Sequence, residues 1–256
     1  MKPHLRVLLW AGLIASALYI ATDLLCAAMY PGYSLLDHAI SELSATGAPT
    51  KRLWSAMGPV YEVLMIAFGV GVLRAGANNR VLRVTGWLLL VFAATGFLWA
   101  FFPMHQRGTQ FNWQDIGHIV LTIVTVGLIL TYIGFGAFAL GRRFRLYSFA
   151  TILALVAAFA VTFARADRIA AGLPTPWLGL TERVNVYGYL LWVAVLAVAL
   201  VLNAEKVVDL GGRHRVPTRY KPHLPTTPIT LPDAERARIA LGRIEDVPVH
   251  TRTRAR

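Results

Sequence analysis

Histidines, acids and serines lie close together in a few short stretches of this sequence, and these stretches are where chemistry is expected. Residues 37–44 read Asp-His-Ala-Ile-Ser-Glu-Leu-Ser. His38 could act as the base for a nucleophilic Ser41. With His105, His118 and a carboxylate, it could instead hold Zn²⁺ with one position open for water. If the protein is an enzyme, the pattern therefore predicts hydrolytic chemistry of one of these two kinds.

Other candidates would bind a ligand rather than react with it. Arg183 would contact a phosphate or carboxylate, and acids or histidines would relay protons. The sequence contains no HExxH, HxxxH or GxSxG motif, so neither a metal nor a reaction follows from a motif. The candidate catalytic residues are His38, Ser41, Glu42, His105 and His118, and the candidate ligand-binding residues are Asp37, Ser44, Glu62, Glu182 and Arg183.

Long apolar blocks must position these residues. The chain of 256 residues is 56% hydrophobic and only 15% charged, whereas a soluble domain carries about a quarter charged residues. Blocks of about twenty apolar residues cross about 30 Å of hydrocarbon as helices, because helices satisfy their own backbone hydrogen bonds. We therefore predict an all-α, polytopic membrane helix bundle with six transmembrane helices, over residues 7–29, 56–74, 84–102, 116–140, 146–165 and 183–203.

Lysine and arginine mark one side of this bundle. They precede the first block, lie in the second and fourth loops and follow the sixth block, with almost no acids among them. Since positive residues of short loops stay in the cytoplasm, the sequence predicts that both termini are cytoplasmic.

The candidate residues fall at the opposite, extracytoplasmic end. Glu62 is near the outer start of the second block, His105 ends the third, and Arg183 begins the sixth. Charges at membrane depth are costly unless they are paired or hydrated, so their common level predicts a polar cavity on that side. In the first extracytoplasmic loop, residues 35–45 are expected to form a short amphipathic helix over the cavity.

The C-terminal region has a different composition. Residues 206–256 are basic and rich in proline, which interrupts regular structure, so this cytoplasmic tail is expected to be disordered. The predicted domains are thus a transmembrane domain over 1–205 and a tail over 206–256. The net charge of +12 belongs to this tail and to the ends of the spans. Membrane lipids, not nucleic acid, are therefore the expected partners. Nothing in the sequence indicates an oligomeric state.

Four segments resemble a known family. They are YPGYSLLDHAISELSATGAP at 30–49, FPMH at 102–105, GH at 117–118 and LTERV at 180–184. Over about residues 5–205 the sequence resembles the uncharacterised bacterial and archaeal membrane family called domain of unknown function 998. The resemblance implies a six-span protein of a bacterial or archaeal plasma membrane. It implies no reaction, so function must be inferred from the site.

Three functions remain open at this point. The favoured hypothesis is a cavity on the extracytoplasmic side that binds a lipid headgroup or small molecule. The first alternative is an intramembrane lipid hydrolase, with or without Zn²⁺. The second is a structural or regulatory membrane protein whose polar residues hold its helices together.

Overall fold

The structure is a computed structural model that describes residues 3–213. The regular structure of these residues is helical, and they form no strand. Most of the predicted tail over 206–256 lies outside the described residues. The long helices are α1 (Pro3–Met29), α2 (Lys51–Ala75), α3 (Arg80–Gly96), α4 (Trp113–Gly136), α5 (Arg142–Phe163) and α7 (Leu178–Arg213), and the short ones are the 3-10 helices η1 (Ile40–Ser44) and η2 (Phe97–Ala100) and the helix α6 (Ala166–Ala170).

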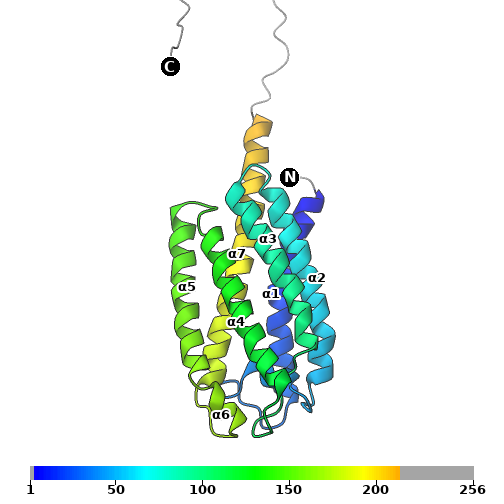
Figure 1. Ribbon diagram of the computed structural model, residues 1–256. Coiled ribbons are helices and arrows are strands. Elements are labelled where there is room, and N and C mark those ends of the chain that lie inside the picture. The colour runs from blue at the N-terminus through cyan, green and yellow to red at the C-terminus, as the bar shows by residue number, and fades with distance from the viewer. Residues whose placement is uncertain (1–2, 214–256) are drawn as a thin grey trace, which may run out of the picture. The chain divides into compact units, whose positions relative to one another are not determined.

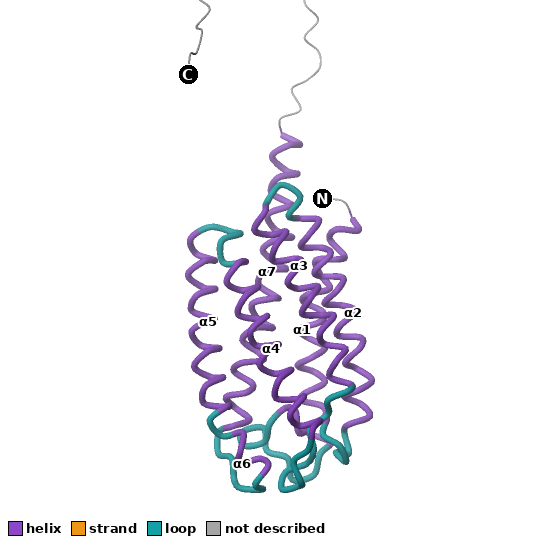
Figure 2. Tube along the Cα trace, in the orientation of Figure 1, coloured by secondary structure: helices purple, strands orange, loops and turns teal. Residues whose placement is uncertain are grey.

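The six predicted spans are confirmed as helices long and apolar enough to cross a membrane. Successive long helices run in opposite directions (Figures 1 and 2). The loops over 30–50, 101–112 and 164–177 therefore lie together, at the end of the bundle opposite the N-terminus. We call this end the distal end. That it faces away from the cytoplasm stays a prediction.

Helix α7 forms the centre of the bundle and α5 lies at its edge. Half of the most apolar stretch of α7 is buried, against 17% for α5. The Trp192 side chain of α7 is fully buried, with its ring centroid 5.6 Å from that of Tyr132 and 5.7 Å from that of Phe144. A Cβ on Gly136 would overlap this indole. Glycine at that position therefore lets α4 approach α7 closely.

The start of α4 is fixed by a capping box. The Asn112 side chain accepts a hydrogen bond from the Gln114 amide at 2.7 Å, and the Asp115 carboxylate accepts one from the Asn112 amide at 3.0 Å. These side chains satisfy amides that have no partner within the helix. Asp115 is thereby held at the distal end of the bundle.

The first loop is less helical than expected. Only Ile40–Ser44 is helical, as a 3-10 turn, so the amphipathic helix over 35–45 is unconfirmed. The Ser34 hydroxyl donates to the Asp37 carboxylate at 3.1 Å and accepts from the Asp37 amide at 3.2 Å, while the Ser34 amide donates to His38 Nδ1 at 3.0 Å. Such local bonds between side chains and backbone compete with an α-helix, and they close a turn before η1.

Candidate functional site

A buried ion pair joins the first and last spans near the distal end. Arg183 Nε donates to Asp23 Oδ2 at 2.9 Å, and its Nη2 donates to Asp23 Oδ1 at 2.8 Å. Asp23 has no exposed surface, and Arg183 is 6% exposed. Tyr187 donates a further short hydrogen bond to the same carboxylate. The pair therefore fixes α7 against α1 at this level.

The rest of the Arg183 guanidinium holds the first loop. Its Nη1 donates to the Leu35 carbonyl at 2.8 Å and approaches the carbonyls of His38 and Gly179 at 3.3 Å. Its Nη2 also donates to the Tyr33 hydroxyl at 2.9 Å. Every N–H donor of Arg183 thus has a protein acceptor. A ligand contact by Arg183 stays a prediction and would have to replace one of these bonds.

Tyr33 continues this network into the loop. Its hydroxyl donates to the carbonyls of His38 and Ala39, at 3.1 and 2.8 Å. Burial raises the pKa of the Tyr33 phenol above its usual value, with the nearby Arg183 opposing the shift. The phenol is therefore protonated at neutral pH, as its donor role requires.

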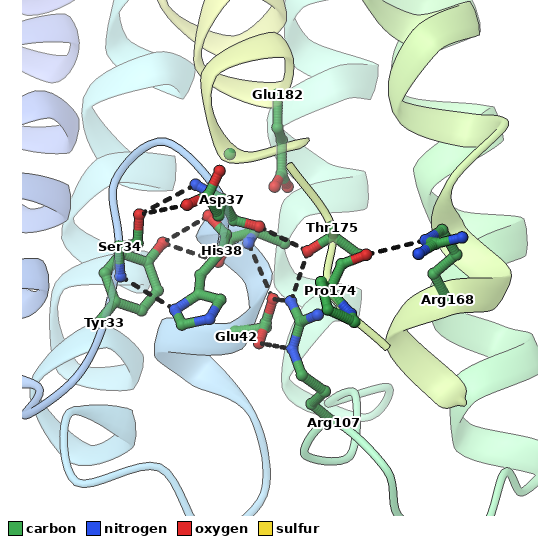
Figure 3. Close-up of polar contacts among 12 residues, drawn as sticks. Tyr33, Ser34, Asp37, His38, Glu42, Arg107, Arg168, Pro174, Thr175 and Glu182 are labelled. Atoms are coloured by element: carbon green, nitrogen blue, oxygen red, sulfur yellow. Dashed lines mark hydrogen bonds and ion pairs between the residues drawn. The ribbon is translucent and has the colours of Figure 1, made fainter. Parts of the chain in front are cut away.

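A second ion pair connects the three distal loops, as Figure 3 shows. Arg107 Nη2 donates to Glu42 Oε1 at 2.8 Å and to the Thr175 hydroxyl at 2.9 Å, while its Nη1 donates to the Leu173 carbonyl at 2.8 Å. Thr175 in turn donates to the Asp37 carbonyl at 2.7 Å. Arg107 thus links the first, second and third distal loops.

Asp37 and His38 have structural contacts within this loop layer. The Asp37 carboxylate accepts from the Trp177 amide at 3.0 Å, and Trp177 has a positive φ of 66°. The His38 ring lies 5.3 Å from the Tyr33 ring, and its Nδ1 accepts from the Ser34 amide. These bonds fix the path of the loop. The ligand-binding and catalytic roles expected of Asp37 and His38 stay predictions.

A cavity of about 450 Å³ lies among the helices at the distal end. Its wall is mostly apolar and aromatic. It extends from the buried Tyr61–Tyr189 pair to Phe97, Phe111 and Phe163, which are 40–53% exposed. Phe97 and Phe163 belong to spans, so part of the wall consists of exposed side chains of the spans. The ionisable residues of its wall are Lys51, Glu62, His105, Asp115, His118 and Glu182.

The predicted site residues divide between this cavity and the loop layer. Ser41, Ser44, Glu62, His105, His118 and Glu182 line the cavity. Asp37, His38, Glu42 and Arg183 are not among the lining residues, and they take part in the hydrogen bonds of the loop layer and the buried ion pair described above.

His105 is oriented by an acid at the cavity wall. Its Nδ1 lies 3.1 Å from Asp115 Oδ2, and its backbone amide donates to Asp115 Oδ1 at 2.8 Å. Its other ring nitrogen, Nε2, lies 3.3 Å from the side-chain nitrogen Nδ2 of Asn112. Both contacts are satisfied if Nδ1 carries the proton and Nε2 accepts. An imidazole held in this way could act as a base after Asn112 moves aside.

The side chains of His118 and Glu182 each form one hydrogen bond within the protein. His118 Nδ1 lies 2.9 Å from the Phe102 carbonyl, and the His118 ring packs edge-on against Trp99 at 4.8 Å. A proton on Nδ1 leaves Nε2 as an acceptor, which has no hydrogen-bond partner in residues 3–202. Glu182 Oε2 accepts from the Ile40 amide at 2.7 Å.

The three histidines do not come together as a metal site. Within the described part of the chain, no three histidine, cysteine or acidic side chains form a group that could hold a metal ion. His38 is bound into the first loop, His105 pairs with Asp115, and His118 contacts Phe102.

Sequence reasoning missed several polar partners. Arg107 lies in a loop, and nothing in its local sequence indicates that Glu42, 65 residues away, is its partner. Sequence reasoning also did not predict the contact between the Tyr61 and Tyr189 hydroxyls, which are 3.2 Å apart. Nor did it predict the role of Asn185, whose side chain donates to the Leu155 carbonyl at 2.8 Å. A tyrosine or asparagine inside an apolar span is the signal that would have found them, because such groups need partners in lipid.

Comparison with known proteins identifies the family. No curated protein and no solved structure matches the chain. One family model matches residues 13–199, and its description reads "protein of unknown function (DUF998)". That match covers four of the six spans completely and most of α1 and α7. The chain therefore belongs to this family and is a multi-pass integral membrane protein.

Proposed function

We propose that this protein binds an amphipathic small molecule, such as a membrane lipid, in the distal cavity. The observation that carries the proposal is the course of the cavity, from exposed side chains of the spans such as Phe97 and Phe163 to buried polar groups. Ligand cavities in proteins have volumes of roughly 300–1,000 Å³ and combine apolar walls with a few polar groups. The cavity of about 450 Å³ fits this description.

The amphipathic character of the proposed ligand follows from the wall. Aromatic and aliphatic side chains would pack against its apolar part. Glu62, His118 and Glu182 would bind its polar group, because each has polar atoms at the cavity. Entry from the lipid would spare the ligand a passage through water, which apolar surface disfavours. The loop layer would hold the distal end of the cavity in place.

A matched pair of variants tests the proposal. Ile119 of α4 lines the cavity, whereas the next residue, Val120, is 54% exposed on the same helix. The protein and its Ile119→Trp and Val120→Trp variants would be purified in an uncharged detergent. Their bound small molecules would be extracted and quantified by mass spectrometry. We expect a near-stoichiometric amphipathic compound with the unaltered protein and with Val120→Trp, but not with Ile119→Trp, whose indole would project into the cavity and obstruct it.

An unchanged set of compounds in Ile119→Trp would overturn the proposal. Thermal unfolding of both variants in the same detergent checks that each is folded. Compounds that merely coat the outside of the bundle would be affected as much by Val120→Trp as by Ile119→Trp.

The Asp115–His105 pair supports a second candidate function, hydrolysis of a lipid ester. Ser41 and Ser44 line the same cavity and would supply the nucleophile. In that case the purified protein would hydrolyse a medium-chain p-nitrophenyl ester, and His105→Gln would lose the activity. Hydrolysis that survives His105→Gln, or no hydrolysis above the rate of the detergent alone, would leave ligand binding as the function.

A further inference from the structure

Glu62 is a buried acid without a hydrogen-bond partner at one carboxylate oxygen. The residue is 7% exposed, and its Oε2 has no partner among the described residues. It lies in α2, within a span, and lines the cavity. A carboxylate in such a place is costly unless a counter-charge or hydrogen-bond donor accompanies it. A ligand bound in the cavity could supply that counter-charge or hydrogen-bond donor.

The neighbouring helix leaves room for this carboxyl group. Gly96 at the end of α3 also lines the cavity, and a Cβ at this position would overlap the Glu62 carboxyl group. Any larger residue at 96 would therefore push the acid out of its place. The position of Glu62 thus depends on close contact with a glycine rather than on polar bonds.

The acids of the cavity wall would favour a cationic ligand. Among the described residues, three acids line it, namely Glu62, Asp115 and Glu182, against one lysine, Lys51. Lys51 donates to the Thr46 hydroxyl at 3.2 Å and begins α2 about three helical turns before Glu62. His105 is paired with Asp115, so Glu62 and Glu182 are the acids of the wall for which no described side chain forms an ion pair.

Aromatic rings cover the wall around this acid. Tyr61 precedes Glu62 and lies 5.3 Å from Tyr19, whose ring is 5.5 Å from Trp54. Tyr189 lies 5.8 Å from Phe92, between centroids. All five rings line the cavity. The Tyr61 and Tyr189 hydroxyls bond to each other, 3.2 Å apart. Faces of aromatic rings attract cations, and aromatic walls with a carboxylate suit amines and quaternary ammonium groups.

We propose that Glu62 recognises a cationic nitrogen, an amine or quaternary ammonium group, carried by an apolar ligand. This inference rests on the proposed function, since it concerns the ligand of the same cavity. The ammonium group would supply the counter-charge that Glu62 lacks in the protein. The apolar body would lie along the wall towards Phe97 and Phe163.

Three probes with the same ten-carbon chain test this inference. They are decyltrimethylammonium, decanol and decyl sulfate, and their binding would be measured by equilibrium dialysis of the protein in dodecyl maltoside. Binding to the Ile119→Trp variant is subtracted, which removes uptake by the micelle. We expect decyltrimethylammonium to bind about tenfold more tightly than either other probe.

Two variants of the site and one control complete the design. Glu62→Gln removes the charge at almost constant shape, and Gly96→Ala displaces the carboxyl group without removing it. Each should weaken decyltrimethylammonium binding about tenfold while decanol binding changes little. Asp167→Asn removes an exposed acid at the distal end, outside the cavity lining. It should change the binding of neither decyltrimethylammonium nor decanol.

The outcomes separate this inference from the proposed function. Binding of decanol or decyl sulfate as tight as that of the cation, or unchanged cation binding in Glu62→Gln, would overturn the role of Glu62 and leave the cavity as a ligand site. If no probe binds the unaltered protein more than Ile119→Trp, both proposals fail. Thermal unfolding shows whether the variants fold. If neither Glu62→Gln nor Gly96→Ala folds, Glu62 is required for packing and the inference is overturned.

Discussion

Asp23 and Arg183 form a two-pronged ion pair inside the bundle although they are 160 residues apart in the chain. Two charges removed from water are stabilised only when their geometry is good and their remaining polar atoms are bonded. Both conditions hold, since the loop carbonyls and Tyr33 take the other Arg183 donors. The pair therefore fastens α1, α7 and the first distal loop together.

Replacing Arg183 by lysine should destabilise the protein strongly. Lysine keeps the positive charge but cannot form the planar, two-pronged contact with Asp23 or reach the loop carbonyls as well. Breaking a buried pair costs about 3–5 kcal/mol, and a loss in this range is expected in thermal or denaturant unfolding in detergent. Arg52→Lys, at an exposed residue of α2, is the control and should have no effect. Equal stability of Arg183→Lys and the unaltered protein would contradict the structural role of the pair.

Removing the Arg107 side chain should loosen the distal loops without unfolding the bundle. Arg107→Ala leaves Glu42 and the Leu173 carbonyl without their donor. Because the pair is partly exposed, the expected loss of stability is only about 1 kcal/mol. Hydrogen exchange should become faster in residues 37–46 and 171–177 and stay unchanged in α2 and α3. Faster exchange throughout the spans would show that the pair supports the whole bundle instead.

The Ser148 hydroxyl should contribute more to the free energy of unfolding than the Thr151 hydroxyl on the same helix. Ser148 accepts from the fully buried Trp192 indole N–H at 2.8 Å, whereas Thr151 bonds to the carbonyl of Tyr147 in its own helix. Ser148→Ala leaves the buried indole N–H without its acceptor and should lower the free energy of unfolding by about 1–3 kcal/mol. Thr151→Val should cost less than about 0.5 kcal/mol. Denaturant unfolding in mixed micelles compares the two variants, and similar losses would mean that the Trp192 bond contributes little.

The orientation of the bundle is tested by fusions of a topology reporter. The basic loops predict that fusions at Gly76, Gly141 and Arg213 report the cytoplasm and that fusions at Ala48 and Gly172 report the opposite side. Ala48 and Gly172 both lie in distal loops. Consistent reversal at all five positions would place the distal cavity on the cytoplasmic side, and mixed results would contradict the arrangement of six spans.

The number and position of the spans could be predicted from the sequence because they depend on local composition. A block of about twenty apolar residues must cross or avoid the membrane as one helix, whatever its neighbours do. The predicted block 56–74, for example, falls within α2 (Lys51–Ala75). The common level of Glu62, His105 and His118 also followed from the order of spans and loops.

Only the tertiary structure decided which polar groups meet. Glu182 and Arg183 are sequence neighbours, yet adjacent residues of a helix point in different directions. Arg183 therefore faces Asp23 on α1, while Glu182 bonds to the Ile40 amide and lines the cavity. The rotation of each helix about its axis, set by packing against all its neighbours, makes this choice, and no local pattern encodes it. For the same reason the sequence does not show that Glu42 pairs with Arg107, or that Glu62 lies against Gly96 with one oxygen that has no partner among the described residues.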